Sequence, residues 1–518
     1  MRSAREPSEH VRRRVAHNTA TNVLTKTLGL AVGFLLTPFI LSRVGVASYG
    51  LWALTGSVVA YGALLDFGIT GGLTKHVAEY WARGEVREAE EVIASALSIY
   101  TVFAGVILLA ALLLAPFFPR LFHLQPEVHA TGMRLVILMG LTTALSLPTA
   151  LPMATLRALQ RFDLANVVSL VAIALSASGT VAVLMLGGGI EALVLVHLAV
   201  TAVVQLPAVW LLRRIAPDLR FGWRGATRRT ARKLIAFSWY IFVSQSATRV
   251  QYRTDELIIG AYLPIASVTP YALARRLAEV AQALTDQFMR VLSPLAAELN
   301  AVEDTPRLRV VFLHGTRLSL AIHMPIALTT ALMAGPLLGA WVGEEYVRYA
   351  PLVWLVSAAL LIDTGVWPAG ALLQAISRHQ RLAAFAVFGA ASNVALSIVL
   401  VRRWGLEGVA AATLITTFVT CHLLIAPYVL TTLGVRAGTM LRSVLWPVLI
   451  PVLPSALATI AVRHVVGTAS LVMVLAAMAL GAAIYWAVFL LTGATMAEKE
   501  WVRTTVRSAV AKVRTPSN

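Results

Sequence analysis

Residues 93–115 read IASALSIYTVFAGVILLAALLLA, a run of 23 residues without a charged side chain. The hydrocarbon core of a bilayer is about 30 Å thick, so a helix needs roughly 20 apolar residues to cross it. The run is long enough and apolar enough to do so. It therefore predicts a membrane-spanning helix.

Similar runs recur on both sides of this stretch, along the whole chain of 518 residues. The first follows a basic stretch, as a signal peptide would, but it is too long for one and is interpreted as a retained span. Fourteen spans are predicted, at about 19–41, 49–70, 93–115, 131–153, 165–186, 190–212, 235–260, 268–294, 311–334, 350–372, 383–401, 408–431, 443–462 and 469–492.

The composition supports the same class of protein. Hydrophobic residues make up 58% of the chain, charged residues only 13%, and the mean hydropathy is +0.77. Because a soluble surface needs about a quarter of charged residues, a water-soluble globular protein is excluded. The predicted fold is an all-α integral membrane protein with about fourteen transmembrane helices.

The basic residues indicate the orientation of the chain. There are 43 Lys and Arg against 25 Asp and Glu, a net charge of +18. With a cytoplasmic N-terminus, 29 of the basic residues fall on inner segments, 6 on outer segments and 8 within spans. Cytoplasmic loops are enriched in Lys and Arg, so both termini are predicted to be cytoplasmic.

The eighth predicted span, 268–294, carries an unusual number of charges. Each would cost about 3 kcal/mol at the centre of an isolated helix. If this segment did not cross, every later loop would change sides and the excess of Lys and Arg would lie outside. We therefore expect it to cross, with its charges hidden from lipid: Arg275, Arg276, Glu279, Asp286 and Arg290.

Two halves of the chain resemble each other at a nearly constant offset. Leu41–Ala53 matches Gly260–Ala274, Asp66 falls opposite Asp286, and 189–191 matches 405–407. Chance likeness of Ala/Leu-rich loops is the alternative. A true repeat predicts two six-helix lobes related by a pseudo-twofold axis along the membrane normal, as in some transporters. The predicted division is an N-tail (1–18), N-lobe (19–212), basic linker (213–234), C-lobe (235–433), two further helices (434–492) and a basic C-tail (493–518).

Polar side chains form stripes on two consecutive predicted spans. Arg275, Glu279, Asp286 and Arg290 lie within about 60° of one another at 100° per residue, and Arg249 belongs to a similar stripe on 235–260. Internal ion pairs such as Arg275 with Glu279 are one interpretation. The spans nevertheless hold eight basic residues and fewer acidic ones, among them Asp66, Asp255, Glu256, Glu279 and Asp286. Unpaired cations in a bilayer mark a water-filled path or an anionic ligand, so a cationic cavity is predicted.

The 213–234 linker has eight basic residues around Phe221 and Trp223, which could imitate a nucleic-acid surface. Orientation of the chain and contact with anionic lipid head groups explain it more simply. No nucleic-acid partner is therefore predicted.

Signals for catalysis are weak. The chain has no phosphate-binding G-x-x-x-x-G-K-[ST] loop and no paired histidines at zinc-binding spacing, and Cys421 is its only cysteine. The longest predicted outer loops have about 15 residues, too few for a sizeable catalytic domain. No metal or cofactor is predicted, and transport is favoured over enzymatic activity.

Several short motifs occur along the chain: 36–38 (LTP), 44–51 (VGVASYGL), 65–68 (LDFG), 159–163 (LQRFD), 255–260 (DELIIG), 271–274 (YALA) and 405–410 (GLEGVA). With these motifs the chain resembles the polysaccharide-biosynthesis flippase family, the lipid-linked oligosaccharide branch of the multidrug/oligosaccharidyl-lipid/polysaccharide exporter superfamily.

This resemblance implies two six-helix lobes around a central cavity, in a bacterial inner-membrane protein. The implied activity is translocation of undecaprenyl-pyrophosphate-linked oligosaccharide by alternating access, for O-antigen, capsule or exopolysaccharide assembly. The implied partner is a polysaccharide polymerase. The implied pyrophosphate- and sugar-binding residues are Lys26, Arg249, Arg253, Arg275, Arg276 and Arg290. A coupling proton or sodium ion would bind at Asp66, Glu279 or Asp286. The alternatives are a multidrug/cation antiporter, for which an anionic cavity is expected, and a membrane enzyme of polysaccharide assembly.

Overall fold

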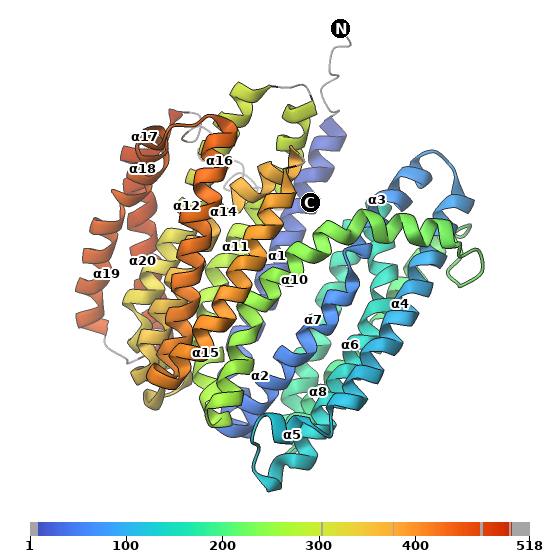
Figure 1. Ribbon diagram of the computed structural model, residues 1–518, viewed down its shortest axis with the longest axis horizontal. Coiled ribbons are helices and arrows are strands. Elements are labelled where there is room, and N and C mark those ends of the chain that lie inside the picture. Colours follow the sequence, from blue (N-terminus) through green and yellow to red (C-terminus); the bar gives the residue numbers. More distant parts are fainter. Residues whose placement is uncertain (1–8, 302–303, 377, 467–469, 497–498, 500–518) are drawn as a thin grey trace, which may run out of the picture. The chain divides into compact units, whose positions relative to one another are not determined.

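The computed structural model describes residues 9–301, 304–376, 378–466, 470–496 and 499. In these residues every regular element is a helix (Figure 1). A helix satisfies its own backbone hydrogen bonds, which lipid cannot do for it, so helical segments suit a sequence this apolar. The predicted all-α class is confirmed.

The predicted spans fall on helical segments. Eleven segments of the described chain are long and apolar enough to cross a membrane. One of them, Gln380–Leu433, contains two predicted spans, since Gly405 at φ 56° breaks α15 (His379–Phe418) between them; glycine adopts this left-handed conformation readily. Two more predicted spans correspond to α10 (Arg228–Tyr262) and α11 (Val268–Ala301), which carry several charges. The prediction of about fourteen transmembrane helices is confirmed.

The chain divides into two compact units, Met1–Leu273 with Ala386–Ala412, and Ala274–Phe385 with Thr413–Asn518. The predicted division into two six-helix lobes stays a prediction. Besides α10, the first unit contains α1 (Glu9–Val44), α2 (Val46–Ala60), η1 (Gly62–Asp66), α3 (Ile69–Ala82), α4 (Val86–Leu114), α5 (Phe118–Leu121), η2 (Pro126–Val128), α6 (His129–Ala158), α7 (Phe162–Met185), α8 (Ile190–Val203), α9 (Gln205–Ile215) and η3 (Ile265–Ser267).

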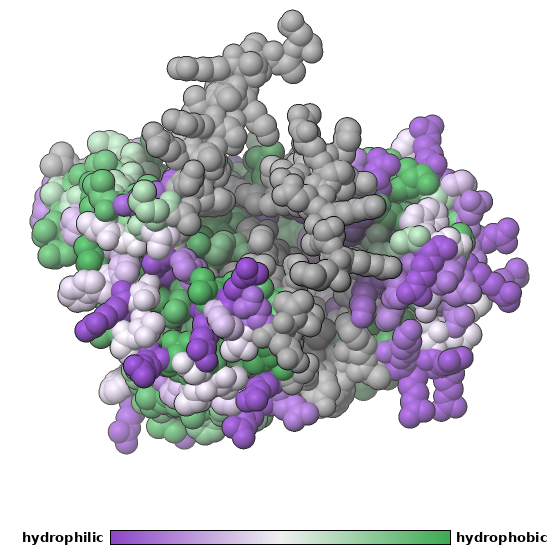
Figure 2. All heavy atoms as spheres, turned by 90° about the horizontal axis from the view of Figure 1, so that it is seen from above, coloured by the Kyte–Doolittle hydropathy of each residue, from purple (hydrophilic) through white to green (hydrophobic). Residues whose placement is uncertain are grey.

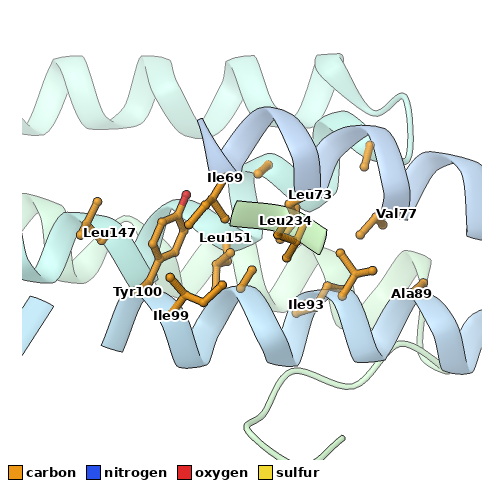
Figure 3. Close-up of a cluster of buried hydrophobic side chains, with 14 of the residues drawn as sticks. Ile69, Leu73, Val77, Ala89, Ile93, Ile99, Tyr100, Leu147, Leu151 and Leu234 are labelled. Atoms are coloured by element: carbon orange, nitrogen blue, oxygen red, sulfur yellow. The ribbon is translucent and has the colours of Figure 1, made fainter. Parts of the chain in front are cut away.

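The core of the first unit forms where α3, α4, α6 and the start of α10 meet (Figure 3). Ile69, Leu73 and Val77 project from α3 at helical spacing towards Ile93 and Tyr100 of α4, and all five are fully buried. In lipid the hydrophobic effect does not drive helices together, so close packing of such side chains has to stabilise the contact.

The outer face of α4 shows how this unit meets lipid. Val102, Val106, Leu109 and Leu113 follow one another at three- and four-residue spacing, and each is at least 50% exposed. Their stripe is suited to acyl chains. Hydrophilic side chains instead gather over the end of the unit where α3, α4 and α10 come together, as Figure 2 shows.

The second unit is built around α12 (Thr305–Leu332). Its partners are α14 (Ala350–Ala375), α19 (Val452–Val466) and α20 (Leu471–Val488). The two final predicted spans therefore pack on a central helix of this unit. Its remaining elements are most of α11, the ends of α15, α13 (Ala334–Val342), η4 (Glu344–Tyr349), η5 (Val419–Ile425), α16 (Ala426–Leu433), α17 (Ala437–Met440), η6 (Leu441–Leu445), α18 (Trp446–Leu449) and η7 (Phe489–Gly493).

Candidate functional site

One polar feature of the first unit is a break in the helical segment Val46–Ala82. Helix α2 ends at Ala60, one 3₁₀ segment (η1) follows, and Phe67 and Gly68 adopt left-handed φ values of 51° and 73° before α3 begins. A left-handed conformation is uncommon for a residue with a side chain such as Phe67. Irregular backbone at membrane depth is tolerated only where protein or a cavity surrounds it, so this break is a candidate site.

Asp66 closes the 3₁₀ segment and is held by two hydroxyl groups. Thr70 Oγ1 donates to Asp66 Oδ1 at 2.6 Å, and the Tyr100 hydroxyl, from α4, donates to the same oxygen. The two hydroxyl oxygens are themselves 2.8 Å apart. Among the described residues, Oδ2 of Asp66 has no hydrogen-bond or ion-pair partner. One carboxylate oxygen is thus fixed in place while the other is available to a cation or a proton.

Arg249 of α10 stabilises the same break from the other side. Its Nη1 donates to the carbonyl oxygen of Ala60 at 3.0 Å. In an unbroken helix this carbonyl would accept from Leu64, but Leu64 N donates to Tyr61 instead. A cation at the C-terminal end of a helix is also favoured by the helix dipole. The half-buried guanidinium group interacts electrostatically with Asp66, so one basic and one acidic residue of the predicted site are brought together.

Two further contacts join α10 to the break. The hydroxyl groups of Tyr61 and Thr254 are 2.5 Å apart, and the rings of Phe67 and Phe242 stack with centroids 3.8 Å apart. Together with the hydrogen bond of Arg249, these contacts connect α10 to residues 60–67 at three positions along the helix. Any motion of α10 is therefore coupled to the backbone around Asp66.

The 44–51 and 255–260 motifs each contact residues next to the other motif within this unit. A Cβ atom on Gly50 would lie 2.4 Å from the carbonyl oxygen of Ile265, and one on Gly260 would lie 2.8 Å from Leu54. Thr269 Oγ1 also donates to the carbonyl oxygen of Val46 at 2.7 Å. These glycines are required by close helix contact, as in other membrane interfaces.

In the second unit, Arg275 pairs with an acid on its own helix. Its Nε donates to Glu279 Oε1 at 2.8 Å, and the arginine is 8% exposed. Arg317 donates to the carbonyl oxygen of Ser443 at 3.3 Å. In the first unit Arg134 pairs with Glu191 at 2.9 Å. Part of the predicted cation excess is thus satisfied by ion pairs and part by backbone carbonyls, which stabilise a guanidinium without neutralising it.

The other predicted site residues are distributed over both units. Lys26 and Arg253 lie in the first, and Arg276 and Asp286 in the second; all four are half-buried. Lys26, Arg253 and Asp286 each make a hydrogen-bonding, ring or electrostatic interaction. The side chain of Arg290 lies outside the described residues. A shared cationic cavity stays a prediction.

Three contributors to this site have no strong sequence signal. Asp66 was a candidate because it is an acid in an apolar run, but Thr70, Tyr100 and the carbonyl oxygen of Ala60 were not. Only the 65–68 motif, with an aspartate followed by Phe-Gly, hinted at a helix break. Tyr100 comes from another helix, so no local pattern connects it with Asp66.

Sequence comparison defines the class of protein. Residues 40–351 match the family described as "Polysaccharide biosynthesis protein", which covers more than half of the chain. The chain therefore belongs to the polysaccharide biosynthesis protein family.

Two relatives extend this assignment. "Uncharacterized membrane protein EpsK" of Bacillus subtilis (strain 168) is 22% identical over 83% of this chain and 86% of its own length. "Probable flippase AglR" of Haloferax volcanii is 22% identical over 74% of this chain and 77% of its own length.

Two solved structures have a similar fold. A multidrug resistance MATE family transporter of the MOP superfamily, in an inward-facing conformation, matches with a TM-score of 0.69 and 14% identity, over 79% of this chain and 94% of its own. The lipid II flippase MurJ, in an inward closed conformation, matches with a TM-score of 0.67 and 14% identity, over 91% and 98%. The chain thus shares the fold of these two proteins, and its apolar helices make it a multi-pass membrane protein.

Proposed function

We propose that this protein is a flippase that translocates an undecaprenyl-pyrophosphate-linked oligosaccharide across the bacterial inner membrane by alternating access. The observation that carries this proposal is the group of arginines on α10 and α11, inside the segment that the family match covers. The predicted spans hold more basic than acidic residues, so ion pairs within the chain leave positive charge that requires a negative partner. A pyrophosphate supplies that charge, and two of the proteins with similar sequence or fold are named flippases.

In this proposal Lys26, Arg249, Arg253, Arg275, Arg276 and Arg290 hold the pyrophosphate and the sugars. Asp66, Glu279 or Asp286 binds the coupling proton or sodium ion, and the lipid tail stays in the membrane. Both termini are cytoplasmic, and a polysaccharide polymerase uses the product. The protein performs no covalent chemistry.

The test is translocation of a lipid-linked oligosaccharide in proteoliposomes. Arg249, Arg275 and Arg290 are replaced singly by Ala, with Arg403→Ala as the control because Arg403 is exposed on a predicted outer segment. We expect at least a tenfold slower translocation for each of these three variants and an unchanged rate for the control. Normal translocation by all three would contradict the cationic site.

A multidrug antiporter of the same fold is the second candidate, favoured by the availability of Asp66 Oδ2 to a cation. Efflux of a cationic dye by the same proteoliposomes, without movement of the lipid-linked sugar, would support it. A membrane enzyme would instead convert the substrate without moving it, so product analysis separates the third class.

A further inference from the structure

The basic linker is a folded part of the first unit. Ala216, Leu219 and Leu234 are buried in the same core as α3 and α4. The backbone N–H of Arg220 donates to Glu90 Oε1 at 2.7 Å, and the backbone N–H of Thr227 donates to Ser95 Oγ at 3.2 Å. The position of the linker along α4 is therefore set by specific contacts.

Two acids of α4 hold backbone and hydroxyl groups of the linker. Glu90 accepts from the N–H of Arg220, and Glu91 Oε1 accepts from the hydroxyls of Thr227 and Thr230. Glu91 thereby places a negative charge at the N-terminus of α10, where the helix dipole favours it.

Four arginines of the linker, by contrast, lie at the surface. Arg220, Arg224, Arg228 and Arg232, which we name the basic platform, are all exposed. Within the described residues, none of these four side chains makes an ion pair. Arg228 and Arg232 also lie in the first turns of α10, where a cation opposes the helix dipole. A cluster that costs stability in the isolated protein suggests an anionic partner outside the chain.

Trp223 indicates where that partner lies. Its indole N–H donates to Thr101 Oγ1 at 3.2 Å, yet the ring is 63% exposed. Thr101 is followed directly by Val102, the first residue of the exposed apolar stripe on α4. A tryptophan with a satisfied N–H and an exposed ring, between an apolar stripe and a group of arginines, is typical of the membrane–water interface.

We propose that the basic platform is a docking surface for the head groups of anionic phospholipids. A bilayer surface presents many phosphates in one plane, so the four arginines need not converge on one ligand. The apolar stripe continues into the acyl region and the arginines lie at the level of the phosphates, which a nucleic acid would not match. Each arginine near an anionic membrane surface contributes about 1 kcal/mol, or about fivefold in affinity.

The experiment measures lipids retained by the purified full-length protein in detergent, by native mass spectrometry, with phosphatidylglycerol or phosphatidylethanolamine added. We expect preferential retention of phosphatidylglycerol, weakened at least tenfold when all four platform arginines are changed to Gln. Arg224→Gln alone should weaken it about fivefold. Raising the salt concentration should reduce the difference between the two lipids.

The matched control changes four exposed arginines on predicted outer segments to Gln: Arg43, Arg120, Arg402 and Arg403. It removes the same charge and should leave phosphatidylglycerol retention within twofold of the parent. Equal losses in both quadruple variants, or no loss in the platform variant, would overturn the proposal. A thermal unfolding curve verifies that each variant is folded, and Arg224→Gln decides the outcome if the quadruple variant is not.

A competition experiment distinguishes a lipid-binding surface from a nucleic-acid-binding surface. An RNA oligonucleotide added to the same protein should not displace phosphatidylglycerol at physiological salt. Displacement at micromolar RNA would identify the platform as a nucleic-acid surface and overturn the lipid assignment. Because retention is measured without transport, its failure would leave the flippase proposal untouched.

Discussion

Arg249 donates a hydrogen bond to the carbonyl oxygen of Ala60, where helix α2 stops. The same guanidinium group is within electrostatic reach of Asp66, six residues further along the broken segment. One side chain therefore connects α10, the end of α2 and the candidate ion-binding carboxylate.

Two substitutions of Arg249 can distinguish its structural role at the break after α2 from a role in substrate binding. Arg249→Ala leaves the Ala60 carbonyl without its donor, which should cost about 1–3 kcal/mol of stability. Arg249→Lys can still donate and keeps the charge, so it should restore most of the thermal stability. If Arg249 also binds pyrophosphate in a bidentate manner, translocation by the Lys variant should stay at least tenfold slow. Full recovery of translocation by Lys would limit Arg249 to support of the break.

The charge of Asp66 should determine the response to an ion gradient. Asp66→Asn keeps the shape and can still accept from Thr70, but it cannot bind a coupling cation by charge. We expect translocation in proteoliposomes to lose its dependence on an imposed proton or sodium gradient. Asp218→Asn, at an exposed position in the linker, is the control. A gradient response that persists in Asp66→Asn would move the ion site elsewhere.

Tyr100 should contribute to the stability of the first unit through its hydroxyl group. Tyr100→Phe keeps the buried ring and removes one donor to Asp66, which we expect to cost about 1 kcal/mol in detergent unfolding. Tyr262→Phe is the comparison, since Tyr262 is 43% exposed and its loss should be close to zero. Equal effects of the two substitutions would argue against the Asp66–Tyr100 contact.

Two glycines of α2 should respond in opposite ways to the same substitution. Gly50→Ala would place a methyl group 2.4 Å from a backbone oxygen, so the helices must separate, at a cost of about 1–3 kcal/mol or more. Gly56→Ala meets nothing within 4 Å, and alanine is the better helix former by up to about 1 kcal/mol. The ranking of thermal unfolding temperatures tests this, and a harmless Gly50→Ala would contradict the close contact.

The Arg275–Glu279 pair can be reversed. Because the pair is local to one helix, Arg275→Glu combined with Glu279→Arg should recover most of the stability that either change alone removes. Translocation should not recover if Arg275 also faces the substrate. Recovery of both properties would show that Arg275 acts only within the pair.

The number and approximate places of the spans followed from sequence, because a transmembrane helix is recognised by the apolar composition of about 20 consecutive residues. The exceptions are instructive. Both α10 and α11 were predicted as spans although they carry several charges, and the distribution of Lys and Arg supported the prediction that α11 crosses. The predicted span 49–70 ends close to the break, but the left-handed backbone at Phe67 and Gly68 was not predicted.

By itself the sequence determined the membrane class, the helical segments and which charged residues lie within them, because each is a property of local composition. Only the tertiary structure decided what those charges contact. Asp66 meets Tyr100, and Arg249 meets Ala60, across 34 and 189 residues of chain. Such contacts depend on how each helix is rotated and packed, which no single apolar run specifies. The same holds for Glu90 and Glu91, although the linker offers many arginines. Glu90 accepts from the backbone N–H of Arg220, and Glu91 accepts from two threonine hydroxyls.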